Sequence, residues 1–421
     1  MALPNNILQS VQTYQRSELA YLTNLFAFIS TSNKKFKDFE NLEANLGDTV
    51  TFDLPPRYTT TNTLVATFQD SQQRVQSLTV DKAVNTAYAF STQQFIFNVR
   101  EYMERFGKAA VYEIGSQVES DIASTIVDHT YRFYGDGVAA INSYGQLATA
   151  LSYFRNYSAA KDNVRGYLSD IAVPAIVNSG LSQFVMDRNE DIANSWQLGN
   201  FSNCEWYQSN MLPLHISGDV GNGASAAVQT LTVVSTNDPT GANITQITCT
   251  CDGSLSGDAN AIFVGDVGQF VDGVSGKPDM RFLQFVGHKV SANPVQIRAT
   301  ANAGASGTTV VLSVSPALVS VANQNQNINN NVVAGMKIKM MPSHRAGLII
   351  SGDALFLAMP RLPEEVPFPT ANESDPESGV SLRTYYGSLF GQNQRGFVHD
   401  IIWGKTLVDE YAMRVLFPVT V

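Results

Sequence analysis

The amino-acid sequence predicts an α+β protein with an all-β domain inserted into it, and three observations support this fold class. Residues 46–98 contain two segments in which apolar and polar residues alternate, as they do in half-buried strands. Residues 99–134 carry apolar residues at helical spacing. Residues 218–333 are rich in Gly, Ala, Asn, Ser, Thr and Val and show no helical period. Because 421 residues exceed the usual size of a single core, several domains are expected.

The first 45 residues are predicted to form a helical arm. Apolar residues fall on one broad stripe over residues 5–31, and Asn5 and Asn6 can cap the start of that helix. Two interpretations of the stripe stay open: the helix packs on its own domain, or it docks on a partner molecule.

Residues 46–98 are predicted to form a long two-stranded arm. The outgoing strand, Asp48–Leu54, places Val50, Phe52 and Leu54 on one face, and a proline pair ends it. The return strand follows a polar run and again has a period of two. An isolated hairpin is marginal in water and exposes hydrogen-bonding edges. We therefore expect a neighbouring copy of the chain to supply the missing surface.

A long helix is predicted over Val99–Tyr134, within a segment that ends near residue 142. Its length would be roughly 50 Å, and Gly135-Asp-Gly137 is interpreted as its C-terminal stop signal. Gly107 and Gly115 each weaken the helix by about 1 kcal/mol, which makes them hinge candidates.

Two segments, 143–217 and 334–421, are predicted to form one domain that flanks the insertion. The first should contain a helix at Tyr144–Phe154 and a buried strand at Asp170–Pro174. The second contains several strand patterns and a Pro-rich acidic loop, Pro360–Ser378. That loop is either a solvated connection or a site for a metal or a cationic partner on an assembly surface.

The segment 218–333 is predicted to be an inserted β-barrel or β-sandwich. Turn residues recur between short strand candidates, at the spacing of a small antiparallel domain. The candidates are Val228–Ser235, Ile244–Cys251, Gln269–Val271, Met280–Val290, Val295–Thr300 and Thr308–Val314.

The composition excludes some functional classes. Charged residues are 15% of the chain, and 27 basic residues stand against 37 acidic ones. A nucleic-acid-binding surface needs clustered Lys and Arg, and no such run exists, although a container can enclose a nucleic acid without binding it tightly. Three cysteines are too few for a disulfide-built fold. With no secretion signal and no apolar stretch of membrane-spanning length, a soluble chain made in a reducing cytoplasm is expected.

The sequence offers no catalytic, cofactor or metal site, so an enzyme is not expected. The five histidines are scattered, without ligand spacing. No nucleophile elbow, phosphate-binding loop or dinucleotide fingerprint is present. Cys249 and Cys251 lie on one face of a predicted strand, where they are interpreted as ordinary strand residues, since a metal site would need further ligands. Glu364 and Glu365 lie in a Pro-rich loop, which would hold them poorly for acid–base chemistry.

Three segments, taken in order, resemble tailed-bacteriophage major capsid proteins of the Hong Kong 97 fold. Leu46–Leu54 resembles the first strand of that family's extended loop, Val99–Tyr134 its spine helix, and Asp400–Arg414 the closing segment of its axial domain. The opening residues and the 218–333 insertion are similar to the coat proteins of short-tailed Salmonella phages. Some members of the family cross-link their subunits through a Lys and an Asn, and we assign neither residue to a position in this sequence.

The resemblance implies a virion protein that is assembled in the host bacterial cytoplasm. Pentamers and hexamers of the chain would form an icosahedral head around double-stranded DNA, with scaffolding, portal and decoration proteins as partners. On this interpretation 1–45 is an arm, 46–98 the extended loop with peripheral strands, 99–142 the spine segment, and 143–217 with 334–421 the axial domain.

Charged residues on the arm are candidates for contacts between subunits. We expect Asp53, Arg57, Arg74 and Lys82 to form ion pairs across the interface that fix its register.

Two alternatives to a phage capsid protein remain: an encapsulin-like nanocompartment shell that encloses enzymes, and a β-rich adhesin or fibre protein. A typical nanocompartment chain is shorter and lacks a large β insertion, and the long predicted helix disfavours a fibre.

Overall fold

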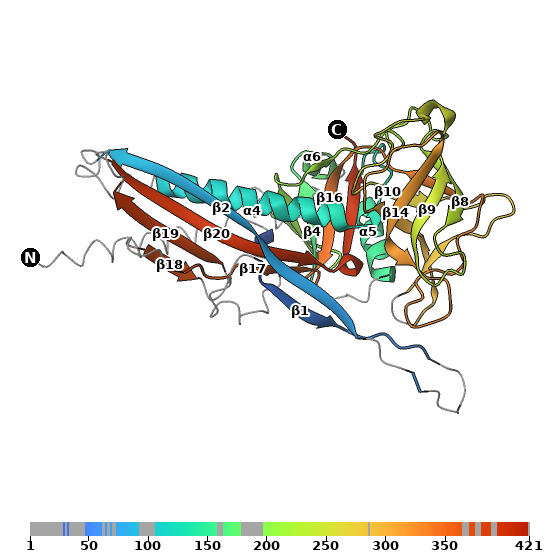
Figure 1. The fold of residues 1–421 in the computed structure, drawn as a ribbon, viewed down its shortest axis with the longest axis horizontal. Helices are drawn as coiled ribbons and strands as arrows, with labels where there is room; N and C mark the ends of the chain where they lie inside the picture. The colour runs from blue at the N-terminus through green and yellow to red at the C-terminus, as the bar shows by residue number, and fades with distance from the viewer. Residues whose placement is uncertain are drawn as a thin grey trace, which may run out of the picture. The chain divides into compact units, whose positions relative to one another are not determined.

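A computed structural model of the chain describes most of its residues (Figure 1). The described residues are 28–29, 32, 47–60, 64, 68–69, 73–91, 106–157, 163–177, 197–284, 287–363, 370–374, 380–388 and 394–419. Contacts between residues divide the chain into two compact units. The first contains 1–54, 75–123 and 355–407, and the second contains 55–74, 124–354 and 408–421.

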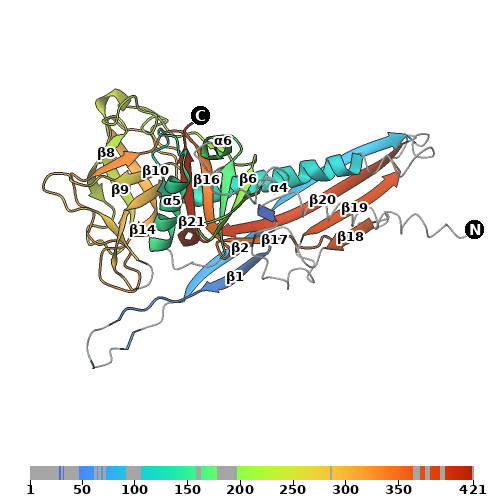
Figure 2. The ribbon, with the colours of Figure 1, turned by 180° about the vertical axis from the view of Figure 1, so that it is seen from behind.

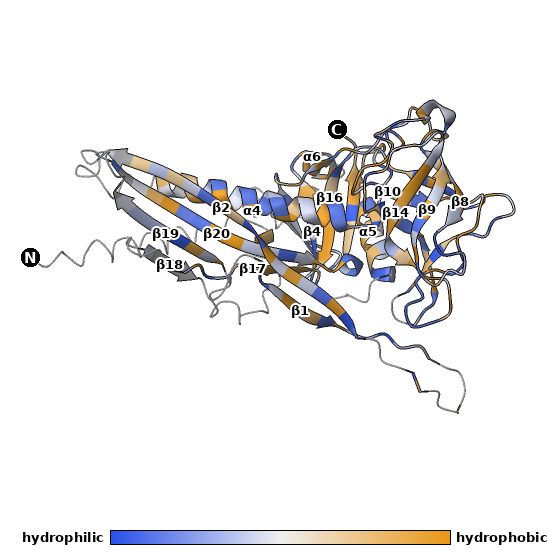
Figure 3. Ribbon diagram, viewed as in Figure 1, coloured by the Kyte–Doolittle hydropathy of each residue, from blue (hydrophilic) through white to orange (hydrophobic). Residues whose placement is uncertain are grey.

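A twisted antiparallel sheet forms the body of the first unit. Its strand order is β1-β2-β20-β19-β18, and a further strand, β17, also pairs with β20. The strands are β1 (Thr49–Leu54), β2 (Arg74–Ser91), β17 (Leu355–Ala358), β18 (Thr370–Ser374), β19 (Ser381–Ser388) and β20 (Gln394–Leu407). Hydrophobic and hydrophilic residues alternate along β2 (Figure 3), as the period of two in the sequence predicted.

The expectation of a two-stranded arm completed only by another copy is wrong for the return strand. From Val80 to Ser91, β2 pairs with β20 of the same chain, opposite residues 404 to 394. Leu78 and Val80 are fully buried. Because β20 lies more than 300 positions along the sequence, no local pattern could identify it as the partner.

The long helix is shorter than predicted. It is observed as α4 (Lys108–His129), and residues 99–105 lie outside the described residues. The buried stripe includes Val111, Ile114, Val118 and Ile122, which confirms its helical period. The helix ends before Tyr134, because Phe133–Tyr134 forms a strand, β3, that pairs in parallel with β21 (Ala412–Phe417). The glycines at 135 and 137 therefore follow a strand and do not stop the helix.

The end of the predicted N-terminal helix packs on its own chain. Phe28 and Ile29 are fully buried. Their backbone N–H groups donate to the carboxylate of Glu119, with N to O distances of 2.6 and 3.2 Å. The rest of residues 5–31 lies outside the described residues.

A second sheet organises the second unit, with strand order β3-β21-β16-β4-β6-β5 and with β7 paired to β16. The remaining strands are β4 (Val164–Ser169), β5 (Gln197–Phe201), β6 (Cys204–Ser209), β7 (Leu214–His215) and β16 (His344–Ser351). Helix α5 (Tyr144–Tyr157) packs Leu147, Leu151 and Phe154 into a core shared with β4, β6, β16 and β21. The strand expected at Asp170–Pro174 is wrong: the strand ends at Ser169, and α6 (Val173–Val177) follows after a turn.

The insertion is a closed barrel, which decides between the two predicted architectures. Its strands close in the order β10-β13-β14-β9-β8-β15. Figure 2 labels β8, β9, β10 and β14 of this barrel. They are β8 (Thr230–Thr236), β9 (Ile244–Thr250), β10 (Val267–Phe270), β13 (Gln296–Ala299), β14 (Thr309–Leu318) and β15 (Lys337–Met340). The closing strand, β15, lies beyond residue 333. The segment predicted as one strand over Met280–Val290 is divided between β11 (Arg281–Leu283) and β12 (Val290–Pro294), which pair with each other.

Two 3-10 turns, η5 (Gly253–Leu255) and η6 (Asp409–Tyr411), complete the elements. The described part of the chain is rich in β structure, and its longest helices are α4 and α5.

Candidate functional site

The loop between β1 and β2 exposes apolar side chains to solvent. Leu64 and Phe68 have 107% and 98% of their reference surface accessible. Tyr58 at the start of the loop and Val75 just after it are also exposed. Scattered single apolar residues on a surface are normal, but a group of them on one loop marks a contact site.

Two of the predicted contact residues, Arg57 and Arg74, meet at the neck of this loop. Each donates from Nη2 to Oε1 of Glu410, and the Arg74 distance is 2.7 Å. Both arginines thus share one carboxylate of the same chain. Glu410 lies in η6, between the last two strands of the sequence.

A second bridge joins the two sides of the loop just beyond the neck. The backbone N–H of Thr59 donates to Oε1 of Gln69 at 2.9 Å, and Nε2 of Gln69 donates to the carbonyl of Thr59. The same Oε1 accepts from Nε2 of Gln324, in the loop that precedes β15, at 3.3 Å. The loop therefore has a defined base.

Around Glu410 lies a buried group of charged side chains. The Arg132 guanidinium lies over the rings of Phe154 and Tyr157, 5.2 and 4.5 Å from their centres. Its Nη1 donates to the Glu410 carbonyl at 3.4 Å, and burial lowers the pKa of Arg132. Burial also raises the pKa of Asp409 to about 6, against the opposing effect of Arg298.

The other predicted contact residues, Asp53 and Lys82, are exposed on β1 and β2. Lys82 lines a cavity of about 370 Å³ between β2 and α4, together with Val84, Ile114 and Trp403. Asp53 and Lys82 belong to the first unit, whereas Arg57, Arg74 and Glu410 belong to the second.

Helix α4 is tied to β20 beside this cavity. The indole Nε1 of Trp403 donates to Oδ2 of Asp121 at 2.9 Å, and Nζ of Lys405 pairs with the same carboxylate. Of the two hinge candidates, Gly107 lies in a π-helical turn directly before α4, and Gly115 is buried within the helix.

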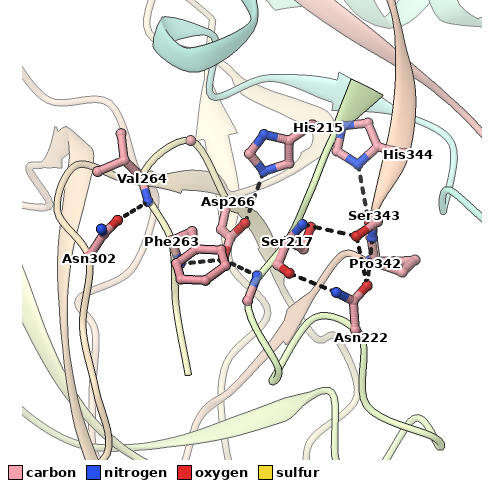
Figure 4. Close-up of polar contacts among 12 residues, drawn as sticks. His215, Ser217, Asn222, Phe263, Val264, Asp266, Asn302, Pro342, Ser343 and His344 are labelled. Atoms are coloured by element: carbon pink, nitrogen blue, oxygen red, sulfur yellow. Dashed lines mark hydrogen bonds and ion pairs between the residues drawn. The ribbon is translucent and has the colours of Figure 1, made fainter. Parts of the chain in front are cut away.

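The barrel is joined to the sheet of its own unit through buried polar residues (Figure 4). The carboxylate of Asp266, 1% exposed, accepts from Nε2 of His215 at 2.9 Å and from the N–H groups of Gly218 and Phe263 at 3.0 and 2.8 Å. Ser343 and Asn222 form a further polar link at 2.9 Å. These contacts hold β7 and the residues before β16 against the start of the barrel.

Within the described residues, no group of three or more His, Cys, Asp and Glu side chains is placed to hold a metal ion. Cys249 and Cys251 are buried free thiols in the barrel, and burial raises the pKa of Cys249 to about 12. In the same part of the chain, no helix has the length and apolar character needed to cross a membrane.

Sequence reasoning missed Glu410, Leu64 and Phe68. Glu410 lies in the closing segment Asp400–Arg414, and no local pattern connects it to Arg57 and Arg74, which lie more than 300 positions earlier. Leu64 and Phe68 do interrupt the polar stretch of the loop, and this was a readable signal for a contact at its tip.

The fold is similar to solved structures from bacteriophages. A structure from Mycobacterium phage Che8 aligns over 93% of this chain and 90% of its own, with 7% identity and a TM-score of 0.45. The capsid of Ralstonia phage GP4 aligns over 93% and 88%, with 8% identity and a TM-score of 0.45. The head structure of Helicobacter pylori bacteriophage KHP40 aligns over 88% and 84%, with 10% identity and a TM-score of 0.37. No family model and no curated protein matches the chain.

Proposed function

We propose that this chain is the shell subunit of a bacteriophage head. Copies of it assemble into an icosahedral container for double-stranded DNA, with scaffolding, portal and decoration proteins as partners. Its role is structural, in the virion, and assembly takes place in the host cytoplasm.

One observation carries the proposal: an anchored loop presents Leu64 and Phe68 fully to solvent. Burying a side chain of this size contributes about 1.5–3 kcal/mol, and the described part of this chain contributes none of that burial. A second copy that covers both side chains would gain this energy at every loop of a shell. Repeated over many identical contacts, small gains give a stable assembly.

Asp53 and Lys82 stay candidates for charged contacts between copies. Both are exposed, and an exposed ion pair contributes about 0–1 kcal/mol. Their effect would therefore be on the register of the contact more than on its strength.

The test is the double variant Leu64→Ser/Phe68→Ser. Because neither side chain is buried in the single chain, we expect an unchanged unfolding midpoint but no shells by negative-stain microscopy or light scattering. Val234→Ser, which removes an exposed valine from β8 of the barrel, is the matched control and should assemble normally.

Normal shells from the Leu64→Ser/Phe68→Ser variant would contradict the role of the loop. A wild-type chain that stays a monomer or a trimer would contradict the shell and favour a fibre or adhesin. The cargo distinguishes the two kinds of shell: nuclease-protected DNA is expected, and an enclosed enzyme would instead indicate a nanocompartment.

A further inference from the structure

Both ends of the exposed loop are held by one carboxylate. Arg57 stands at the start of the 55–74 loop and Arg74 at its end, and both donate to Oε1 of Glu410. The three side chains are largely withdrawn from water, with 14%, 26% and 17% of their surface exposed. Ion pairs of this kind are screened less by salt than surface pairs.

The turn that carries Glu410 is itself fixed within the second unit. The N–H of Tyr411 donates to the carbonyl of Val408 at 3.0 Å, and the N–H of Val408 donates to that of Ala354 at 2.8 Å. Arg132, fully buried, contacts the Glu410 carbonyl from the other side. A carboxylate held in this way can fix the positions of the two arginine side chains that bind it.

The ion pairs close the loop at its neck, and the Thr59–Gln69 bridge repeats the closure further out. A loop that is closed at its base loses fewer conformations when its tip binds. Part of the conformational entropy that the tip residues Leu64 and Phe68 would lose on binding is therefore already lost in the free chain.

We propose that Glu410 is the positioning residue of the 55–74 loop: it clamps Arg57 and Arg74 together and so sets the place from which the apolar tip contacts a second copy. The effect on assembly rests on the proposed function. The clamp itself is a property of the single chain and can be tested there.

The first experiment uses limited trypsin digestion of the unassembled chain. Trypsin cleaves after Arg57 and Arg74, and both are protected while their side chains are bound. In Glu410→Gln we expect cleavage at both sites to accelerate by at least about tenfold, because local opening governs proteolysis. The global unfolding midpoint should change little, because the released loop places both arginines in water.

Two controls separate the clamp from a general loss of stability. Glu205→Gln removes an exposed glutamate that pairs with Arg165 at 3.4 Å in the same unit, and it should leave cleavage unchanged. Arg57→Gln/Glu410→Gln should expose Arg74 no more than Glu410→Gln does, since residues that share one interaction are not additive. Wild-type cleavage rates in Glu410→Gln, or acceleration at only one of the two sites, would overturn the proposal.

The second experiment measures the chain concentration needed for shell formation by light scattering. We expect Glu410→Gln to raise it by about tenfold, a smaller effect than that of the tip substitutions. If Glu410→Gln opens the loop but leaves the chain concentration needed for shell formation unchanged, the positioning role is overturned. A wild-type chain that never assembles would contradict the proposed function, while the trypsin result would still decide on the clamp.

Discussion

A buried histidine gives the first unit a dependence on pH. His399 is fully buried in β20, where Nε2 lies 3.0 Å from the hydroxyl of Tyr88 and Nδ1 lies 2.9 Å from that of Thr384. Hydroxyl groups can accept or donate, so both ring nitrogens of the neutral imidazole have a partner. Burial lowers the pKa of His399 to about 4.

This shift predicts that the His399 contribution to stability is lost as the pH falls from about 6.5 toward 4. The unfolded histidine, with a pKa of about 6.5, binds a proton between pH 6.5 and 4 and the folded one does not. Stability from this group is therefore complete above pH 6.5 and falls as the pH drops toward 4, by up to about 3 kcal/mol. Urea unfolding at a series of pH values should show this slope, and His399→Gln should reduce it.

Part of the dependence of the unfolding free energy on pH will persist in His399→Gln. His344 is also buried, and burial lowers its pKa to about 3, so it acts in the same direction. An identical slope in the variant and the wild type would contradict the assignment to His399.

At the scale of elements, the end of α4 shows what a local pattern misses. The apolar spacing continues past His129, yet Phe133 leaves the helix. Its N–H donates to Oε1 of Gln296 at 2.9 Å and its carbonyl accepts from Nε2 of that residue at 2.8 Å. The side chain of Gln296, in barrel strand β13, thus takes the place of a neighbouring strand. Together with β21 it favours an extended backbone at a position where periodicity predicted a helix.

The hinge proposal belongs to the same element. If the proposed shell expands after assembly and Gly107 and Gly115 are its bend points, Gly107→Ala/Gly115→Ala should stabilise the helical conformation by about 1 kcal/mol at each position and slow that expansion. Expansion can be followed by the change in particle diameter in electron micrographs. Ser116→Ala, beside Gly115, is the control and should expand at the normal rate. Unaltered expansion of the double variant would remove both glycines as hinges.

At the scale of the whole molecule, the barrel is an insertion that polar bonds fasten to the sheet of its own unit. The chain enters it after β7 and leaves it before β16, two strands that pair with each other. Asp266 binds His215 of β7, and the buried Arg414 of β21 donates to the carbonyl of Gly265 at 2.9 Å. The barrel is therefore joined to this sheet by more than its two chain connections.

Removing the Asp266 charge should loosen this attachment. Asp266→Asn exchanges one acceptor oxygen for an NH₂ group that faces the donors at this site. Losing one partner of a buried charged group typically costs about 3–5 kcal/mol, and we expect a loss near the lower end, measured by urea unfolding. Asp272→Asn removes a partly exposed barrel carboxylate paired with Arg281 at 2.8 Å, and it should cost less than about 1 kcal/mol. Equal losses in the two variants would contradict the anchoring role of Asp266.

Features that depend on neighbouring residues in the sequence were predicted, and features that depend on distant residues were not. The strand Thr49–Leu54, the body of α4 and the barrel strand Ile244–Thr250 were predicted well, because their periodicity records which face is buried. The end of α4, the pairing of β2 with β20 and the closure of the barrel by β15 were not, because their partners lie far away along the chain. Arg57 and Arg74 were predicted to pair with another copy, and the structure pairs both with Glu410 of the same chain, a partner more than 300 positions away that no local pattern identifies.

The sequence by itself determined the low charge content of the chain, the class and order of most elements, and the presence of an inserted β domain. These properties depend on hydrophobic periodicity and turn residues, which act over a few positions. Only the tertiary structure decided that β2 belongs to the chain's own sheet and that Glu410 binds both ends of the loop. It also decided that Leu64 and Phe68 stay uncovered. Such facts depend on which distant residues meet, and that is settled when the whole chain packs.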